Sequence, residues 1–375
     1  MIHPSDFYNL LKENEINFFT GIPDSLLKSF CAYVTDNTSF ENHVISANEG
    51  GAIALAAGNY LSTGKIPLVY MQNSGQGNAV NPLMSLTDSD VYSMPMLLLI
   101  GWRGKPGVKD EPQHVKQGKI TLDLLETLGI PYRVLPDSIE ETKGVLNAAL
   151  NYMHDRNSPF ALVAEKGTFE DYSLKNKTET SFELNREDAI KLITSRLSLD
   201  DVVVSTTGKT SRELFEYRER LRQGHEKDFL TVGSMGHSSQ IALGIALQKQ
   251  NRQVYCFDGD GASIMHLGSL AIIGQKKPKN FKHIIFNNGS HDSVGGQPTA
   301  AFGMDFPAIA RACGYNQAWT VESEQDIIEK MDLIKSVEGP VLLEIKVNKG
   351  SRKDLGRPTT TPIGNKKDFM GFLED

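Results

Sequence analysis

The chain has 375 residues, which predicts two domains at ~100–200 residues per domain. Its 39% hydrophobic and 23% charged residues are typical of a globular protein and exclude a disordered, collagen-like or small disulfide-stapled one. The 39 basic and 46 acidic side chains give a net charge of −7, so we expect no nucleic-acid partner.

Cysteine usage and hydropathy both favour a cytoplasmic protein. Cys31, Cys256 and Cys313 are far apart, which is typical of free thiols in a reducing compartment rather than of a disulfide framework or a zinc site. The first residues lack a basic stretch followed by an apolar one, so no signal peptide is expected. The longest apolar run, residues 94–100, is far shorter than the ~18 residues that span a bilayer, and no membrane partner is expected.

Short apolar runs alternate with helical patterns along the chain, which predicts parallel α/β architecture. A helix is expected over residues 50–60, with Gly64 as its stop signal. Residues 178–185 are polar and aperiodic and are predicted to be a linker, so the first domain is expected to span residues 1–177. The strands predicted in this half lie near residues 16–20, 44–46, 66–71, 96–100, 132–135 and 160–164.

The second half, residues 186–375, repeats this pattern as a second domain. Residues 186–197 are predicted to form an amphipathic helix, and another is expected from residue 263 to about residue 275. Strands are predicted near residues 202–205, 229–232, 254–257, 283–286, 318–321 and 341–347. We therefore expect two doubly wound α/β domains with mostly parallel six-stranded sheets.

Glycine-rich turns follow several predicted strands, at the carboxyl ends where doubly wound sheets bind ligands. Glycine lets backbone amides approach a phosphate closely, and the start of a following helix favours the anion. Neither GxGxxG nor a P-loop pattern is present, which argues against a dinucleotide site and a nucleoside triphosphate site. Each turn taken alone is also explained as a tight connection. The turns comprise residues 21–25, 73–78, 207–211, 233–236, 258–262 and 287–290.

Asp260 and Asn288 follow two consecutive predicted strands, and adjacent parallel strands would bring them to one edge of a sheet. Their oxygens suit Mg²⁺, which keeps few protein ligands and also binds phosphates. Asp258 offers a competing carboxylate in the same turn. Alternatively, Asp260 caps the following helix and Asn288 shapes a turn, which explains each residue separately.

The Gly-Asp-Gly of residues 259–261, followed by Asn-Asn at 287–288, resembles the cofactor motif of the thiamine diphosphate-dependent decarboxylases. The resemblance implies that Asp260, Asn288 and the Ser290 carbonyl bind Mg²⁺, and that the metal holds the diphosphate. Residues 233–236 and 207–210 also resemble turns of this family, in the expected order. The implied cofactor contacts in this half are Thr207, Gly208, Lys209, Gly233, Ser234, Met235, Gly259, Asp260, Gly261, Ala262 and Asn288.

In the family, a bulky apolar residue wedges the cofactor into a bent shape, which would be Met235 here. The Gly233 carbonyl would accept a hydrogen bond from the pyrimidine amine of the cofactor. Taken alone, Met235 is more typical of an ordinary core residue. Lys209 is open to two interpretations, because it could contact either the diphosphate or the substrate.

Residues 47–52, followed by 56–64, resemble the segment that carries the catalytic glutamate of the family, which makes Glu49 the candidate. Loss of CO₂ from a 2-oxo acid leaves an electron pair on a carbonyl carbon, and thiamine supplies the electron sink. Glu49 would hydrogen-bond a pyrimidine nitrogen and promote proton transfer. Alternatively, Glu49 is a glutamate in a first helical turn, stabilised by the helix dipole.

The resemblance also has consequences for assembly. In this family, the glutamate domain and the diphosphate domain that share one cofactor belong to different subunits. A homo-oligomer of at least two chains, with cofactor sites at subunit interfaces, is therefore implied. Larger members insert a middle domain, for which the predicted linker is too short.

Residues 21–27, 101–114 and 293–299 resemble the phosphonopyruvate decarboxylases within this family, with the sulfopyruvate decarboxylases next. The latter are commonly split into two polypeptides, whereas this chain carries both halves, which favours the phosphono substrate. The residues expected to contact a small anionic 2-oxo acid are Asp24, Ser25, Arg103, Lys105, Gln113 and Gln297.

Residues 102–119 hold five basic and two acidic side chains. A basic loop would steer an anion to the site, although a solvated surface loop explains the charges as well. His114 is a candidate proton donor because its ordinary pKa lies near neutrality, and a structural role is the alternative. Other functions left open are decarboxylation of sulfopyruvate or other 2-oxo acids, and a non-catalytic cofactor-binding subunit. The presence of both Glu49 and the Asp260–Asn288 pair argues against a non-catalytic subunit, which would not need both.

Overall fold

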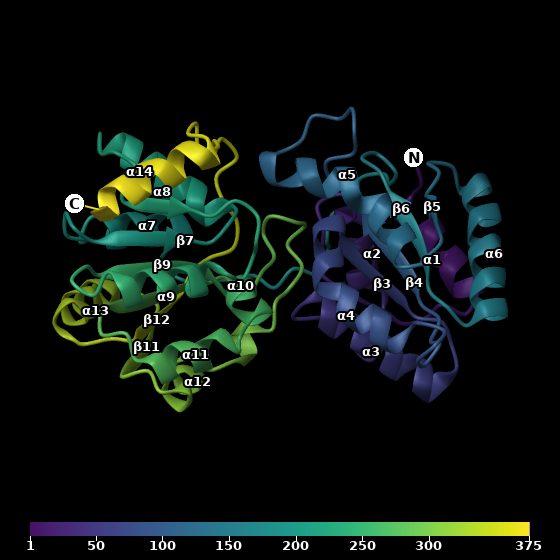
Figure 1. The fold of residues 1–375 in the computed structure, drawn as a ribbon, viewed down its shortest axis with the longest axis horizontal. Helices are drawn as coiled ribbons and strands as arrows, with labels where there is room; N and C mark the ends of the chain where they lie inside the picture. Colours follow the sequence, from purple (N-terminus) through teal and green to yellow (C-terminus); the bar gives the residue numbers. More distant parts are fainter. Residues whose placement is uncertain (375) are drawn as a thin grey trace. The chain divides into compact units, whose positions relative to one another are not determined.

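The computed structural model describes residues 1–374, which divide into two compact units (Figure 1). The first unit holds Met1–Lys177 together with Ser293–Gln297. The second holds Thr178–Asp292 and the described residues from Pro298 onward. Within residues 1–374, no helix combines the length and the apolar character needed to cross a membrane.

The first unit is built on a six-stranded sheet with the order β2-β1-β3-β4-β6-β5, in which every strand pair is parallel. Its strands are β1 (Phe19–Gly21), β2 (His43–Ile45), β3 (Leu68–Gln72), β4 (Leu97–Gly101), β5 (Tyr132–Val134) and β6 (Phe160–Ala164). Its helices are α1 (Pro4–Glu13), α2 (Lys28–Asn37), α3 (Glu49–Thr63), η1 (Asn73–Gly75), α4 (Gln76–Leu86), α5 (Pro112–Thr127) and α6 (Ile139–Arg156).

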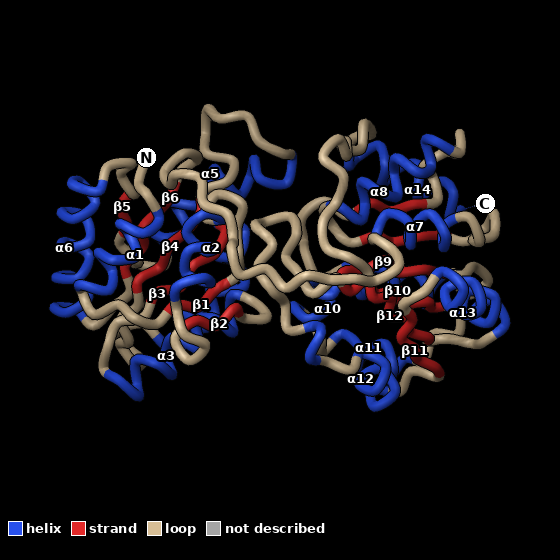
Figure 2. The backbone as a smooth tube through the Cα atoms, turned by 180° about the vertical axis from the view of Figure 1, so that it is seen from behind, coloured by secondary structure: helices blue, strands red, loops and turns tan. Residues whose placement is uncertain are grey.

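Helices cover both faces of this sheet (Figure 2). Leu68 and Tyr70 of β3 pack with α1, α2 and α6, whereas Val69 and Met71 pack with α3 and α4 on the opposite face. Successive side chains of a strand alternate between faces, so a strand buried on both sides reads as a continuous apolar run. This is why the sequence patterns of these strands are apolar rather than alternating.

The second unit repeats the plan, with the all-parallel strand order β11-β12-β10-β9-β7-β8. Its strands are β7 (Val202–Ser205), β8 (Asp228–Leu230), β9 (Val254–Gly259), β10 (Phe281–Asn287), β11 (Gln317–Val321) and β12 (Val341–Lys346). Its helices are α7 (Arg186–Thr194), α8 (Lys209–Arg220), α9 (Ser238–Gln248), α10 (Asp260–Met265), α11 (Ser269–Lys276), η2 (Ala301–Gly303), α12 (Phe306–Cys313), α13 (Glu324–Ser336) and α14 (Pro362–Glu374). One core lies against α7, α8 and α13, and the other against α9, α11, α12 and α14.

The predicted fold class is confirmed, and each of the twelve predicted strands overlaps an observed one. The predicted stop of the first-half helix is also observed, because Gly64 ends α3 in the left-handed conformation at φ 69°. The single helix predicted from residue 263 to about residue 275 is wrong. The chain leaves helical geometry at His266, with φ −132° and ψ 51°, and starts again as α11.

Candidate active site

Glu49 is the first residue of α3, whose N-terminus is capped by Asn48. The Asn48 side chain accepts a hydrogen bond of 2.9 Å from the backbone N–H of Gly51. This cap places the Glu49 carboxylate at the positive end of the helix dipole, which favours its charged form. The helix start therefore explains why a glutamate is favourable at this position, and it fixes the position of the Glu49 backbone from which the side chain extends.

The Glu49 side chain is buried, with 6% of the residue exposed. Its Oε2 accepts a hydrogen bond of 2.9 Å from Nδ2 of Asn78 on α4. A Cβ added at Gly75 would overlap the Glu49 carboxylate, so the carboxylate packs directly on the η1 turn. Asn78 was not among the predicted site residues, although the Asn-Ser-Gly-Gln-Gly-Asn turn that contains it stood out in the sequence.

Asp260 begins α10 directly after β9, and only 3% of it is exposed. Its Oδ2 accepts a hydrogen bond of 2.5 Å from Oγ1 of Thr299. Burial raises the carboxyl pKa to about 6, although hydrogen bonds from Thr299 and the Gly261 backbone act in the opposite direction. A buried carboxylate with too few charge partners is the kind of group that a bound cation stabilises.

Asn288 and Asp260 lie at the same edge of the second sheet. Strands β9 and β10 pair in parallel, with Gly259 opposite Phe286, and the two residues follow this pair. Asn288 is 3% exposed, its Oδ1 accepts from the backbone N–H of Ser290 at 3.0 Å, and the buried Ser290 hydroxyl has no hydrogen-bond partner. The carboxylate and amide oxygens suit Mg²⁺, and the Ser290 hydroxyl is a donor of the kind that a phosphate oxygen accepts from.

Asp258, the competing carboxylate, is engaged with the strands instead. Its Oδ1 accepts from the Gly259 N–H at 3.0 Å, and its Oδ2 lies 3.4 Å from Nε2 of His283 on β10. Cys256 completes a buried cluster with these two side chains. Burial and Asp258 raise the pKa of the Cys256 thiol well above its ordinary value, so the sulfur stays protonated and is a poor metal ligand.

The turn proposed to hold the thiamine ring has an unusual backbone. Gly233, Ser234 and Gly236 all have positive φ values, of 71°, 49° and 85°. Met235 is half-buried at the centre of this turn and lies outside the two cores of its unit. The Gly233 N–H donates to Oγ1 of Thr207 at 3.0 Å, so two of the predicted cofactor turns meet.

Lys209 starts α8 after Gly208, which has φ 99°. The Lys209 ammonium donates to the backbone carbonyl of Asp292 at 3.2 Å, and burial lowers its pKa. The helix start, this ammonium and the segment after Asn288 therefore lie together in the second unit.

In the first unit, Asp24 lies three residues after the end of β1 and is fully buried. It accepts hydrogen bonds from Nε2 of Gln72 at 2.6 Å and from the Leu26 N–H at 3.0 Å. A Cβ added at Gly101 would overlap the Asp24 carboxylate. Ser25, beside it, accepts a hydrogen bond of 2.7 Å from Nη1 of Arg103. The structure thus brings together three of the predicted substrate residues.

Both predicted substrate cations are already paired with carboxylates. Arg103 binds Asp110 through two hydrogen bonds of 2.8 and 2.5 Å, which raise the pKa of Arg103 and lower that of Asp110. Lys105 lies 2.5 Å from Oε1 of Glu165. This pairing offsets the charge of the first two cations of the predicted basic loop.

The predicted basic loop is also shorter than expected, since α5 begins at Pro112. Lys116 and Lys119 are exposed on this helix rather than on a loop. Gln113 and His114 lie in its first turn, and Nε2 of His114 is 3.5 Å from Nε2 of Gln113. The remaining substrate candidate, Gln297, donates to the Lys28 carbonyl at 3.5 Å.

His114 is 8% exposed, and its buried Nδ1 has no hydrogen-bond partner. Burial, followed by the positive charge of Arg103, lowers its pKa below the ordinary 6.5. The imidazole is therefore neutral at pH 7, which weakens its predicted role as a proton donor. A neutral ring with an unpaired nitrogen remains able to accept a hydrogen bond.

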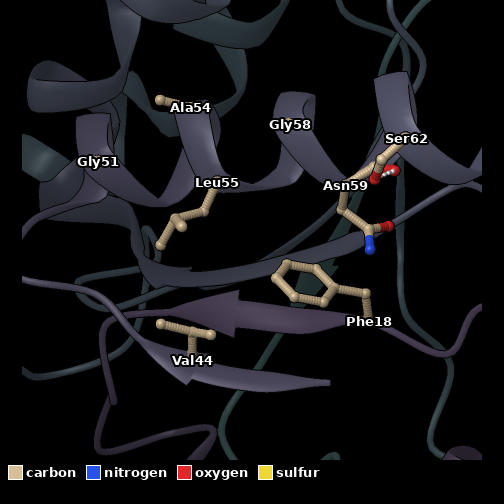
Figure 3. A pocket seen from close by; sticks show the side chains of 8 residues that line it. All are labelled: Phe18, Val44, Gly51, Ala54, Leu55, Gly58, Asn59 and Ser62. Carbon is tan, nitrogen blue, oxygen red and sulfur yellow. Dashed lines mark hydrogen bonds between the residues drawn. The ribbon is translucent and has the colours of Figure 1, made fainter. Parts of the chain in front are cut away.

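A hollow of about 490 Å³ in the first unit lies between α3 and the side of the sheet formed by the edge strand β2 and its neighbour β1 (Figure 3). Leu55 and Asn59 project from α3 toward Val44 and Phe18. None of the predicted site residues lines this hollow, and none of its lining side chains is ionisable. The predicted site residues therefore lie elsewhere in the chain.

Two family models match the chain. The N-terminal thiamine pyrophosphate-binding domain of the thiamine pyrophosphate enzymes matches residues 5–126, and the C-terminal one matches residues 206–345. Thiamine pyrophosphate is a synonym of thiamine diphosphate. Glu49 lies in the first match, and Asp260 and Asn288 lie in the second. The chain therefore belongs to the thiamine diphosphate-dependent enzymes.

Relatives of known activity narrow the class. A phosphonopyruvate decarboxylase of Streptomyces viridochromogenes is 34% identical over 100% of this chain and 95% of its own length, and one of Streptomyces hygroscopicus is 33% identical over the same shares. A sulfopyruvate decarboxylase of Methanosarcina acetivorans is 29% identical over 91% of this chain and 90% of its own length. The chain is a thiamine diphosphate-dependent decarboxylase of this group and hence a carboxy-lyase.

The Methanosarcina relative corrects one expectation from the sequence. It matches both halves of the chain within a single polypeptide. Possession of both halves in one chain therefore does not distinguish the phosphono substrate from the sulfo substrate.

Proposed function

We propose that the chain converts 3-phosphonopyruvate to phosphonoacetaldehyde and CO₂, as a cytoplasmic step of phosphonate biosynthesis. The observation that carries this proposal is the 34% identity to a phosphonopyruvate decarboxylase along the entire chain. The substrate is a small 2-oxo acid with two anionic groups.

Bound thiamine diphosphate supplies the electron sink for the electron pair that CO₂ leaves behind. In the proposal, Asp260, Asn288 and the Ser290 carbonyl hold the cofactor through Mg²⁺. Their burial and oxygen-rich surroundings support this role. Lys209 at the start of α8 offers positive charge to the diphosphate.

Glu49 is the proposed catalytic residue, which would hydrogen-bond a pyrimidine nitrogen of the cofactor and move a proton there. Its bond from Asn78 and its contact with the backbone at Gly75 support this role, because they leave the carboxylate few orientations. A fixed carboxylate needs little reorganisation when the proton moves. Met235 would be the apolar residue that holds the cofactor in its bent shape.

On the substrate side, the proposed contacts are Asp24, Ser25, Arg103, Lys105, Gln113 and Gln297. Arg103 carries three fixed donors, two on Asp110 and one on Ser25. The guanidinium is therefore held in a defined orientation, although the neighbouring carboxylate offsets its charge. His114 would contact the reacting atoms as a neutral imidazole.

The proposal includes a homo-oligomer of at least two chains, with each cofactor between residues 1–177 of one chain and residues 186–375 of another. Residues 178–185 would be the linker. The support is the family arrangement in which the two domains around one cofactor come from different subunits. Sedimentation equilibrium should give a mass of at least twice 41.4 kDa, and a monomer would contradict this part of the proposal.

Sulfopyruvate is the second candidate substrate, because its decarboxylase from Methanosarcina acetivorans is 29% identical over most of the chain. The two substrates share the 2-oxo acid and differ in the second anionic group. Sulfonate carries one charge, whereas phosphonate carries up to two.

The test compares CO₂ release from phosphonopyruvate, sulfopyruvate and pyruvate, each with and without thiamine diphosphate and Mg²⁺. We expect the highest kcat/KM for phosphonopyruvate and no release without the cofactor. A higher value for sulfopyruvate would establish the second candidate. Absence of release from all three substrates in the presence of cofactor and metal would reject both.

The raised pKa of Asp260 predicts how cofactor binding depends on pH. Without metal, this carboxyl has a pKa of about 6, and Mg²⁺ binds its charged form. The Mg²⁺ concentration for half-maximal cofactor retention should be nearly constant above pH ~7 and rise about tenfold per pH unit below pH ~6. Equilibrium dialysis across this range measures it, and a requirement that is flat with pH would contradict the assignment.

A further inference from the structure

The Asn288 amide is held in one orientation by a neighbouring carboxylate. Nδ2 of Asn288 donates to Oδ2 of Asp292 at 2.7 Å. A charged carboxylate only accepts hydrogen bonds, so the NH₂ group of the amide must face Asp292. The Asn288 carbonyl oxygen is thereby turned away from Asp292, where it accepts from the Ser290 N–H at 3.0 Å. Without such a neighbour, either the oxygen or the NH₂ group of the amide can face that side.

Asp292 is itself fixed from several directions, and its side chain is 10% exposed. The backbone N–H of Gly350 donates to the same Oδ2 at 3.0 Å, and Nη1 of Arg186 lies 3.5 Å from it. The carboxylate therefore has little freedom to rotate. Its main-chain carbonyl accepts from the Lys209 ammonium at 3.2 Å, which ties the segment to the start of α8.

Arg186 does not depend on Asp292 for its charge balance. Two hydrogen bonds of 2.8 and 2.9 Å join it to Glu213, and the residues are 7% and 1% exposed. Such a bidentate pair is stable as a unit. Neutralising Asp292 therefore leaves the buried arginine paired, and the fold should tolerate the change.

We propose that Asp292 is a positioning residue that directs the carbonyl oxygen of Asn288 toward the metal ion. This inference rests on the proposed Mg²⁺ site and adds a residue that touches neither metal nor cofactor in it. When a group that hydrogen-bonds a metal ligand without touching the metal is mutated, the metal affinity typically falls by about 10–100-fold. Loss of the carboxylate would let the Asn288 amide present its NH₂ group to the cation.

The test is Asp292→Asn, in which a side chain of the same shape no longer dictates the orientation of Asn288. Thiamine diphosphate retention is measured by equilibrium dialysis over a Mg²⁺ titration, in the full-length protein. The Mg²⁺ concentration for half-maximal retention should rise about tenfold or more. Thermal unfolding of the protein without metal and cofactor should stay close to that of the unaltered protein.

Glu344→Gln is the matched control. Glu344 is 2% exposed on β12 and accepts bonds of 2.6 Å from Asn287 and Thr320. Glutamine can accept from Asn287 and donate to Thr320, so this change also removes a buried negative charge beside the same turn but leaves Asn288 untouched. It should alter the Mg²⁺ requirement by less than about twofold, because the hydrogen bonds of Asn288 are unchanged.

The outcomes separate the possibilities. An Mg²⁺ requirement of Asp292→Asn within about twofold of that of the unaltered protein would overturn the inference. An equal rise in both variants would also overturn it, because charge rather than orientation would then be the cause. Absence of Mg²⁺-dependent retention in the unaltered protein would instead reject the metal site of the proposed function.

Discussion

Replacement of Glu49 by Gln should lower kcat by about 10²–10⁴-fold, the range that a positioned proton-transfer group contributes. Glutamine keeps the length of the side chain and an oxygen that can accept from Asn78, so the packing on Gly75 should survive. It does not carry the proton between the chain and the cofactor. Thiamine diphosphate retention should therefore be maintained while turnover is lost.

Steady-state CO₂ release and equilibrium dialysis of the cofactor measure the two quantities separately. Glu141→Gln is a suitable control, because Glu141 is an exposed glutamate in the first turn of the capped helix α6. If Glu49 acted only through the helix dipole, both variants would lose a few tenths of a kcal/mol of stability and no turnover. Near-normal turnover of Glu49→Gln would reject the catalytic role.

Replacement of Asp260 by Asn should abolish Mg²⁺-dependent retention of thiamine diphosphate and at the same time stabilise the metal-free protein. Asn keeps an oxygen that can accept from Thr299, but it lacks the charge that binds the cation. The raised pKa means that keeping the Asp260 carboxylate charged in the folded protein lowers the free energy of unfolding. From the ordinary 3.8 to about 6, this reduction is ~3 kcal/mol at pH 7.

The sign of this effect follows from linkage. A carboxyl whose pKa is raised by folding contributes stability that is present below its unfolded pKa and is lost as the pH rises through the folded pKa. The stability difference between Asp260→Asn and the unaltered protein should thus be near zero below pH ~4 and largest above pH ~6. Denaturant unfolding without metal at several pH values measures it.

Glu324→Gln, an exposed change in the first turn of α13, controls for the loss of a helix-terminal charge. It should leave both cofactor retention and the pH dependence of unfolding unaltered. Full Mg²⁺-dependent retention in Asp260→Asn would exclude this carboxylate as a metal ligand. A metal-free variant that is less stable than the unaltered protein at pH 7 would contradict the stated cost of burial.

The strands and the turns that follow them were predictable because both are local properties of the chain. Buried parallel strands read as short apolar runs, and glycine and polar residues mark their ends. The placement of Asp260 and Asn288 at one sheet edge needed one further assumption, that β9 and β10 are neighbours. Consecutive strands are often neighbours in space, and here they are.

The partners of these side chains were not predictable. Asn78 and Thr299 contact Glu49 and Asp260 from 29 and 39 residues away along the sequence, whereas Asp292 contacts Asn288 from only four residues away in the same segment. Asn78 and Thr299 belong to segments that stood out for other reasons, and Asp292 carried no signal. The first two contacts depend on how segments that follow different strands meet, and the third depends on the path of the segment after β10; a periodic pattern encodes neither.

The pairing of charged side chains was not predictable from the sequence either. The excess of basic residues after β4 suggested a basic loop that steers an anion to the site. Folding brings Asp110 back onto Arg103 and Glu165 onto Lys105, and the charge available to a substrate falls. Net charge in a sequence window counts the residues, whereas the field at a site depends on distances and on burial.

The sequence by itself determined the two α/β halves and the absence of any long apolar span, and it supplied the candidates proposed to hold a diphosphate and a metal. These follow from composition, periodicity and turn chemistry, which act over a few residues. Only the tertiary structure decided which oxygen atoms are buried together and which cations are already paired. It also decided that the Asn288 amide donates to the Asp292 carboxylate. The reason is that desolvation and hydrogen-bond geometry arise when distant segments pack, and both change steeply over one or two ångströms.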